Sequence, residues 1–155
     1  MERSGMVVLD QQWCRVQKGS YMAKPVILLI DDEKAYAEVI KEALTPMGIE
    51  AHIACNAMEA MLVMQQTTPD LILLDVMMPE VDGLTLLRWL RENSRGKRMP
   101  IHIVSAKARP EDREAALQAG ADGFLAKPFT MQDLKKTLAE YLPILSSNQE
   151  QPNSQ

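Results

Sequence analysis

Three short runs of this sequence are almost entirely apolar and rich in Ile, Leu and Val, and they lie at residues 26–30, 71–74 and 101–104. A strand with one face in water alternates apolar and polar residues. These runs do not alternate, which is typical of strands buried on both faces in a parallel sheet. Residues 51–54 and 123–126 are two weaker strand candidates. The sequence therefore predicts a sheet whose two faces are both covered by helices.

Helical patterns of apolar residues lie between these runs and after the last one, at residues 33–47, 57–66, 84–93, 110–119 and 130–142. The first pattern ends at Gly48, and glycine is a common residue just past a helix C-terminus. The last begins at Thr130 with Asp133 three residues later, a plausible helix cap. Strand and helix therefore alternate along the chain. This order predicts an α/β fold with a parallel sheet, right-handed crossovers and helices on both faces.

The chain of 155 residues is long enough for one domain with a substantial core. We expect that domain to span residues 25–145. Residues 1–24 show no sustained periodicity and are expected to form an N-terminal extension that is unstructured or loosely packed. We expect the fold not to need residues 1–21, with Met22 as an alternative start. Residues 146–155 are polar and are expected to be a disordered tail.

Charge and composition argue against several classes of protein. The net charge of −4 is opposite to the basic balance typical of nucleic-acid-binding domains, so we expect no nucleic-acid partner. No apolar run approaches the roughly 18 residues that a membrane span requires, so we expect no membrane insertion. Cys14 and Cys55 show neither metal-binding nor redox spacing, as expected of free thiols in a reducing compartment. Together these features predict a cytoplasmic protein.

Residues that can do chemistry follow the predicted strands, and they are Asp31, Asp32, Asp75, Ser105 and Lys127. In an open α/β sheet, ligands bind beyond the carboxyl ends of the strands, so we expect these side chains to converge. Clustered carboxylates repel one another, which either raises the pKa of one of them or recruits a cation. A site with few carboxylates and retained water suits Mg²⁺. A lysine opposite the metal could hold a phosphoryl oxygen as a point charge. The pattern indicates phosphoryl transfer to a carboxylate.

The sequence resembles the response-regulator receiver domain of two-component signalling, and it is close in length to the stand-alone chemotaxis type. The resemblance covers about Pro25 to Leu145. The matching segments, in order, are Asp31–Asp32, LILLDVMMPEVDGL around Asp75, Ser105–Ala106 and GADGFLAKPF at residues 120–129. The resemblance implies a flavodoxin-like, doubly wound (βα)5 fold with a five-stranded parallel sheet in the order 2-1-3-4-5. That strand order comes from the resemblance and not from the residues.

The resemblance also implies a role for each residue of the cluster. Asp75 would be the phosphoacceptor that attacks the phosphohistidine of a histidine kinase or phosphotransfer protein. Asp32 and Asp75 would bind Mg²⁺ directly with the backbone carbonyl of Met77, and Asp31 would act mainly through water. Lys127 would contact a phosphoryl oxygen. The resemblance further implies a cis peptide bond between Lys127 and the following proline.

Two further positions would convert phosphorylation into a change of surface. By the resemblance, Ser105 moves to hydrogen-bond the phosphoryl group and Phe124 rotates into the space that is vacated. Many family members carry Thr or Tyr at these switch positions, whereas Phe124 has no hydroxyl. The surface that responds is the fourth helix, fifth strand and fifth helix, roughly residues 110–142, and it would bind a downstream protein of unknown identity. Met77 and Lys107 would flank the path of the hydrolytic water, which implies a long-lived phosphoryl group.

Other functions and structural roles compete with this interpretation. An aspartyl-phosphate phosphatase of the haloacid dehalogenase type needs an acid two residues after its nucleophile, and Met77 stands there, so we expect no turnover enzyme. A phosphate sink or a phosphorylation-independent scaffold remains open. Asp31 and Asp32 could instead cap the helix that follows them. The strand histidines His52 and His102 are expected to be packed and not to bind metal.

Overall fold

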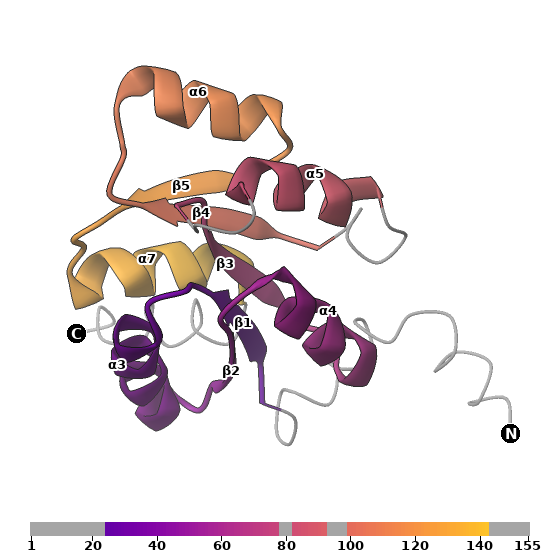
Figure 1. Ribbon diagram of the computed structural model, residues 1–155. Helices are drawn as coiled ribbons and strands as arrows, with labels where there is room; N and C mark the ends of the chain where they lie inside the picture. The colour runs from indigo at the N-terminus through magenta and orange to yellow at the C-terminus, as the bar shows by residue number, and fades with distance from the viewer. Residues whose placement is uncertain (1–23, 78–81, 93–98, 143–155) are drawn as a thin grey trace, which may run out of the picture.

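The computed structural model describes residues 24–77, 82–92 and 99–142, and these form one five-stranded sheet with helices on both faces (Figure 1). The strands are β1 (Val26–Ile30), β2 (Glu50–Ala54), β3 (Leu71–Asp75), β4 (Ile101–Ser105) and β5 (Gly123–Ala126). All are parallel, in the order β2-β1-β3-β4-β5. The predicted fold class and strand order are confirmed. β2 is added on one side of β1 and β3 on the other, so the order in which strands are added to the sheet reverses at this point. Ligand sites in such folds usually lie between the two strands where this reversal occurs, here β1 and β3.

The helices form two layers around the sheet (Figure 1). They are α3 (Lys34–Leu44), α4 (Ala57–Gln66), α5 (Gly83–Glu92), α6 (Pro110–Gln118) and α7 (Met131–Tyr141). Alternate residues of β1 point to opposite layers, because Ile27 packs into the core with α3 and α7 while Leu28 packs into the core with α4, α5 and α6. β1, β3 and β4 are buried at every position, which explains why their sequences do not alternate.

The helix ends follow the capping signals of the sequence with small differences. α3 ends at Leu44, and a 3-10 turn (Thr45–Met47) carries the chain to Gly48, whose φ of 81° is the left-handed conformation that glycine adopts without strain. At α7, the Asp133 backbone N–H donates to Thr130 Oγ1 and the Thr130 N–H donates to Asp133 Oδ2, both at 3.0 Å. This is the capping box expected from the sequence.

Several apolar helix residues face outward although they share the helical spacing of the core residues. Val39 of α3 is 64% exposed, and Met58 and Leu62 of α4 are 69% and 53% exposed. Helical spacing shows that apolar residues lie on the same side of a helix, but it does not determine which of them face the sheet and which face solvent. Every helix in the described ranges is too short or too polar to span a lipid bilayer.

The two histidines occupy different environments. His102 is 5% exposed, and its ring lies in T-shaped contact with Tyr141 at 5.7 Å between centroids. A Cβ on Gly123 would approach His102 Cε1 to 2.2 Å, so the absence of a side chain there makes room for the ring. His52 instead contacts Glu50 at 3.0 Å near the surface. The expected packing is thus correct for His102, whereas His52 is only half-buried.

Burial of His102 predicts that the domain loses stability in mild acid. Burial lowers the pKa of His102, and the nearby charges of Glu140 and Asp122 oppose this only partly. In the unfolded chain the histidine has a pKa of about 6.5. Below this pH the unfolded chain takes up a proton more readily than the folded protein does, so the free energy of unfolding falls by up to about 1.4 kcal/mol per pH unit. The fall ends once the pH passes the lower pKa of the folded state. Urea unfolding between pH 7.5 and pH 5 measures it.

The controls for this prediction use both histidines. His102→Gln should remove most of this pH dependence, even if it lowers stability at every pH. His52→Gln is the comparison variant, because His52 is only half-buried and lies beside Glu50 near the surface. A His102→Gln protein with the full acid-induced loss would show that other groups cause it.

Candidate functional site

Three aspartates meet at the carboxyl edge of the sheet. β1 and β3 are neighbouring strands, so Asp31, directly after β1, and Asp75, the last residue of β3, lie at the same edge. Asp32 follows Asp31, and one carboxylate oxygen from each of the three lies within 4.8 Å of the others. Asp31 and Asp75 are buried, whereas Asp32 is exposed. The cluster has the hard oxygen donors and the solvent access that Mg²⁺ prefers.

Lys127 brings a positive charge into this cluster from β5. Its Nζ donates to Asp31 Oδ2 at 2.9 Å and to Asp75 Oδ2 at 3.3 Å. Burial alone would lower the pKa of Lys127, but the hydrogen bond to Asp31 and the charge of Asp75 outweigh it and raise that pKa. The lysine is therefore a fixed cation that offsets part of the negative charge of the two buried carboxylates.

Backbone groups hold the two buried carboxylates in place. The Met77 N–H donates to Asp75 Oδ1 at 2.9 Å, and the Glu33 N–H donates to Asp31 Oδ1 at the same distance. Burial raises the pKa of Asp75, while the Met77 N–H and Lys127 oppose that rise. Glu33 is the N-cap residue of α3 and makes no side-chain cap hydrogen bond. Neither aspartate is thus the N-cap of this helix, as the alternative interpretation required.

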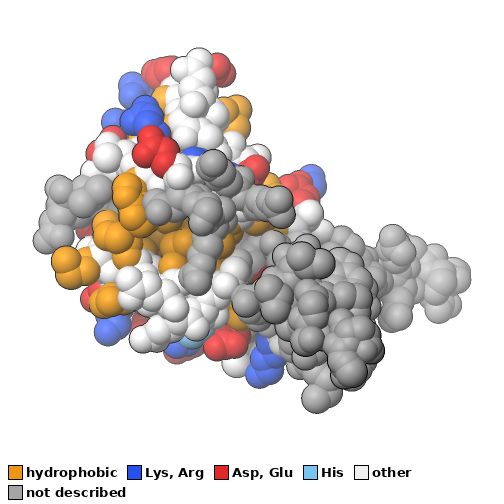
Figure 2. All heavy atoms as spheres, turned by 90° about the vertical axis from the view of Figure 1, so that its right-hand side faces the viewer, with side chains coloured by type: hydrophobic (Ala, Val, Ile, Leu, Met, Phe, Trp, Pro, Cys, Tyr) orange, Lys and Arg blue, Asp and Glu red, His pale blue; other side chains and the backbone are white. Residues whose placement is uncertain are grey.

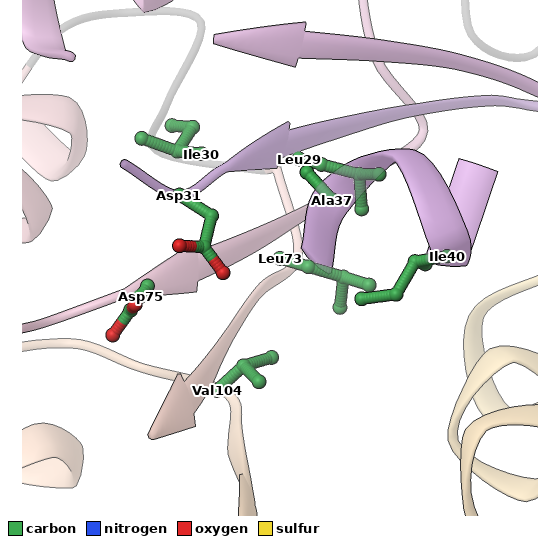
Figure 3. A pocket seen from close by; sticks show the side chains of 8 residues that line it. All are labelled: Leu29, Ile30, Asp31, Ala37, Ile40, Leu73, Asp75 and Val104. Atoms are coloured by element: carbon green, nitrogen blue, oxygen red, sulfur yellow. The ribbon is translucent and has the colours of Figure 1, made fainter. Parts of the chain in front are cut away.

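An apolar cavity lies beside the carboxylates. Asp31 and Asp75 lie at its edge on neighbouring strand ends (Figure 3), and the other side chains around it are Leu29, Ile30, Ala37, Ile40, Leu73 and Val104. Apolar walls on this side keep water away from the buried faces of the carboxylates. Such an environment strengthens the electrostatic contacts within the cluster.

Ser105 and Phe124 lie at the neighbouring strands, as the sequence predicts. Ser105 ends β4 and is fully buried, and its Oγ accepts a hydrogen bond from the Lys107 N–H at 3.0 Å. Its carbonyl accepts a hydrogen bond from the Lys127 N–H at 2.9 Å. Phe124 lies in β5 and is half-buried. Lys107 is exposed on the connection after Ser105.

The sequence does not predict the contacts of three residues in the site region. The Tyr36 ring lies 4.3 Å from Lys127 Nζ and in T-shaped contact with Phe129. A Cβ on Gly83 would lie 2.2 Å from Val76 Cα, so α5 approaches the backbone after Asp75 closely only because residue 83 is glycine. Arg113 of α6 lies over the Phe124 ring. The only sequence signal is the DG pair at Gly83, which resembles an ordinary turn.

Comparisons with known proteins agree with this geometry. The sequence model for the response regulator receiver domain matches residues 27–139. The response regulator MprA of Mycobacterium sp. (strain KMS) is 39% identical over 108 residues, which cover 70% of this chain and 46% of the relative. The MprA of Mycobacterium avium (strain 104) has the same identity and coverage. The chain thus spans about half the length of the curated relatives that it matches.

Solved structures show the same architecture. The chemotaxis protein CheY4 of Vibrio cholerae superposes with a TM-score of 0.73 at 31% identity, covering 77% of this chain and 100% of the other. The receiver domain of the sensor histidine kinase PA1611 of Pseudomonas aeruginosa PAO1, described with a magnesium ion coordinated in its active site cleft, gives a TM-score of 0.71 at 32% identity. It covers 78% of this chain and 99% of the other. The cis bond implied by the resemblance is present between Lys127 and Pro128. The chain belongs to the response regulator receiver domain family of two-component signalling.

Proposed function

We propose that Asp75 accepts a phosphoryl group from the phosphohistidine of a histidine kinase or phosphotransfer protein. The observation that carries this proposal is the position of Asp75, buried at the sheet edge within hydrogen-bond reach of Lys127 and in one cluster with Asp31 and Asp32. In the transfer, a carboxylate oxygen of Asp75 forms a bond to phosphorus while the phosphorus–nitrogen bond breaks. The imidazole leaves with the electron pair of that bond. Receiver domains are phosphoacceptors and not turnover enzymes.

The donor set around Asp75 fits Mg²⁺. Asp32 and Asp75 would hold it directly with the backbone carbonyl of Met77, and Asp31 would hold it mainly through water. When bound, the metal offsets negative charge on the transferring phosphoryl group. Lys127 needs little movement to serve the same group, because its Nζ is already 3.3 Å from Asp75 Oδ2. The magnesium described in the PA1611 receiver domain supports this assignment.

Phosphorylation would act on the surface formed by α6, β5 and α7, within residues 110–142. Ser105 would turn toward the phosphoryl group, and Phe124 would move inward into the space that it leaves. This surface would then bind a downstream protein, with residues 25–145 as the working unit in the cytoplasm. A phosphate sink would accept the phosphoryl group without any change in partner affinity. A pull-down with and without beryllofluoride, an analogue of the bound phosphoryl group, separates these two functions.

Asp75→Asn should abolish Mg²⁺-dependent phosphorylation by acetyl phosphate, because the amide lacks the nucleophilic oxygen. The intact mass of the protein measures phosphate incorporation over time. Asp82→Asn is the matched control, because Asp82 is an exposed carboxylate outside the cluster and should leave the reaction unchanged. Phosphorylation of the Asp75→Asn protein at the parent rate would rule out Asp75 as the acceptor.

Asp32→Asn should weaken Mg²⁺ binding by about tenfold or more, because it removes a charged oxygen ligand. Calorimetric titration measures the affinity. Glu42→Gln serves as the control, since Glu42 is an exposed carboxylate on α3 outside the aspartate cluster. Equal affinities in the Asp32→Asn and parent proteins would contradict a direct ligand role.

Met77→Asn with Lys107→Glu should shorten the lifetime of the phosphoryl group. Met77 is 50% exposed beside Asp75, and neither native side chain offers an acceptor that could orient water for in-line attack. The decay of phosphorylated protein should accelerate by about tenfold, which corresponds to about 1.4 kcal/mol of barrier. The pair Met131→Asn and Lys135→Glu, exposed on α7, is the matched control. Unchanged decay in the first pair would show that these side chains do not set the lifetime.

A further inference from the structure

Arg113 connects the segment after Ser105 to the Phe124 ring. Its guanidinium carbon lies 4.9 Å from the centroid of that ring, within the range of a cation–π interaction. Its Nε also donates a hydrogen bond to the Ala108 carbonyl at 3.3 Å. Ala108 follows Lys107, whose N–H donates to Ser105 Oγ at 3.0 Å. One side chain on α6 thus spans the distance between the β4–α6 connection and the aromatic residue of β5.

These contacts form a continuous path from the active site to the surface. If the Ser105 side chain turns to donate its hydroxyl to the phosphoryl group, its Oγ moves away from the Lys107 N–H, which then loses its hydrogen-bond acceptor. The connection that carries the Ala108 carbonyl can then shift. Arg113 would lose its hydrogen bond to that carbonyl, which helps to keep the guanidinium over the Phe124 ring. Phe124 has no hydroxyl that could report its position through a hydrogen bond. The ring face is therefore the part of this side chain that a neighbour can recognise.

We propose that Arg113 is a positioning residue that holds the Phe124 ring in its present half-buried position in the unphosphorylated protein and couples it to the segment after Ser105. This inference rests on the proposed phosphorylation of Asp75. The Arg113 contact stabilises the present ring position, so its removal favours the inward position and the activated state. Release of Arg113 on phosphorylation also changes where its positive charge lies on the surface that α6 presents to a partner.

The chain contains two phenylalanines, Phe124 and Phe129, which makes a direct spectroscopic test possible. In the full chain labelled with fluorophenylalanine, fluorine NMR gives one resonance for each. Phe124→Leu assigns the two resonances by removing one of them. Arg113→Gln should move the Phe124 resonance toward its beryllofluoride-bound position before any beryllofluoride is added. It should also raise the apparent affinity for beryllofluoride by about two- to fivefold, the size expected for an exposed cation–π contact.

Control variants distinguish loss of the Arg113–Phe124 contact from a general effect of removing a charge or of perturbing the fold. Arg88→Gln removes an exposed arginine on α5 and should change neither the spectrum nor the affinity. Arg113→Lys keeps a cation and should restore part of the parent behaviour. In a Phe124→Leu background, Arg113→Gln should leave the beryllofluoride affinity unchanged, because the ring that it contacts is absent.

Each outcome distinguishes this inference from the proposed function. If the parent protein binds beryllofluoride and Arg113→Gln changes neither the Phe124 resonance nor the affinity, the role of Arg113 is wrong and the proposed function stands. The same conclusion follows if Arg113→Gln lowers the affinity, or if it acts equally in the Phe124→Leu background. If the parent protein binds no beryllofluoride with Mg²⁺ present, both the proposed function and this inference are wrong.

Discussion

The arrangement of the site depends on one partly buried cation, the ammonium group of Lys127, whose side chain is 12% exposed. Asp31 and Asp75 are almost fully buried, and two unpaired carboxylates in such a position would cost several kcal/mol. Lys127 follows β5, while the aspartates belong to β1 and β3, and β4 lies between. Two strand spacings, about 10 Å, separate β5 from β3, so the long lysine side chain must cross the end of β4. The strand order therefore determines which charges can meet.

Much of this arrangement is predictable because the fold and the site share the same sequence signal. A buried parallel strand reads as an unbroken apolar run, and the first polar residue after it lies at the edge where ligands bind. Asp31, Asp75, Ser105 and Lys127 are all identified in this way. The strand order is not, because β1, β3 and β4 have nearly interchangeable apolar sequences. Their order required the resemblance to receiver domains.

The remaining features depend on contacts between residues far apart in the sequence. Tyr36 meets Lys127 because the lysine side chain reaches from the end of β5 to the first turn of α3, and no periodicity encodes that meeting. Val39 shares the helical spacing of the core residues but faces away from the sheet. Arg113 looks like one more charge on a polar helix until Phe124 is placed beneath it. Local sequence patterns thus predict the helices and strands and where they end. Contacts between side chains of different elements can be identified only in the folded structure.

The hydrogen bonds that stabilise the unphosphorylated site are the ones that new hydrogen bonds to the phosphoryl group would replace. Lys127 Nζ donates to Asp31 and Asp75, and Ser105 Oγ accepts from the Lys107 N–H. Both side chains are thus already hydrogen-bonded before a phosphoryl group arrives. Transfer to Asp75 would offer Lys127 a more highly charged acceptor, and it would give the Ser105 hydroxyl, whose oxygen now accepts, an oxygen to donate to. Ser105 and Lys127 stand at the ends of β4 and β5, the strands that flank α6 in sequence. An exchange of hydrogen bonds at these two points would therefore act directly on the segments that hold Arg113 and Phe124, without a hydroxyl on the aromatic ring.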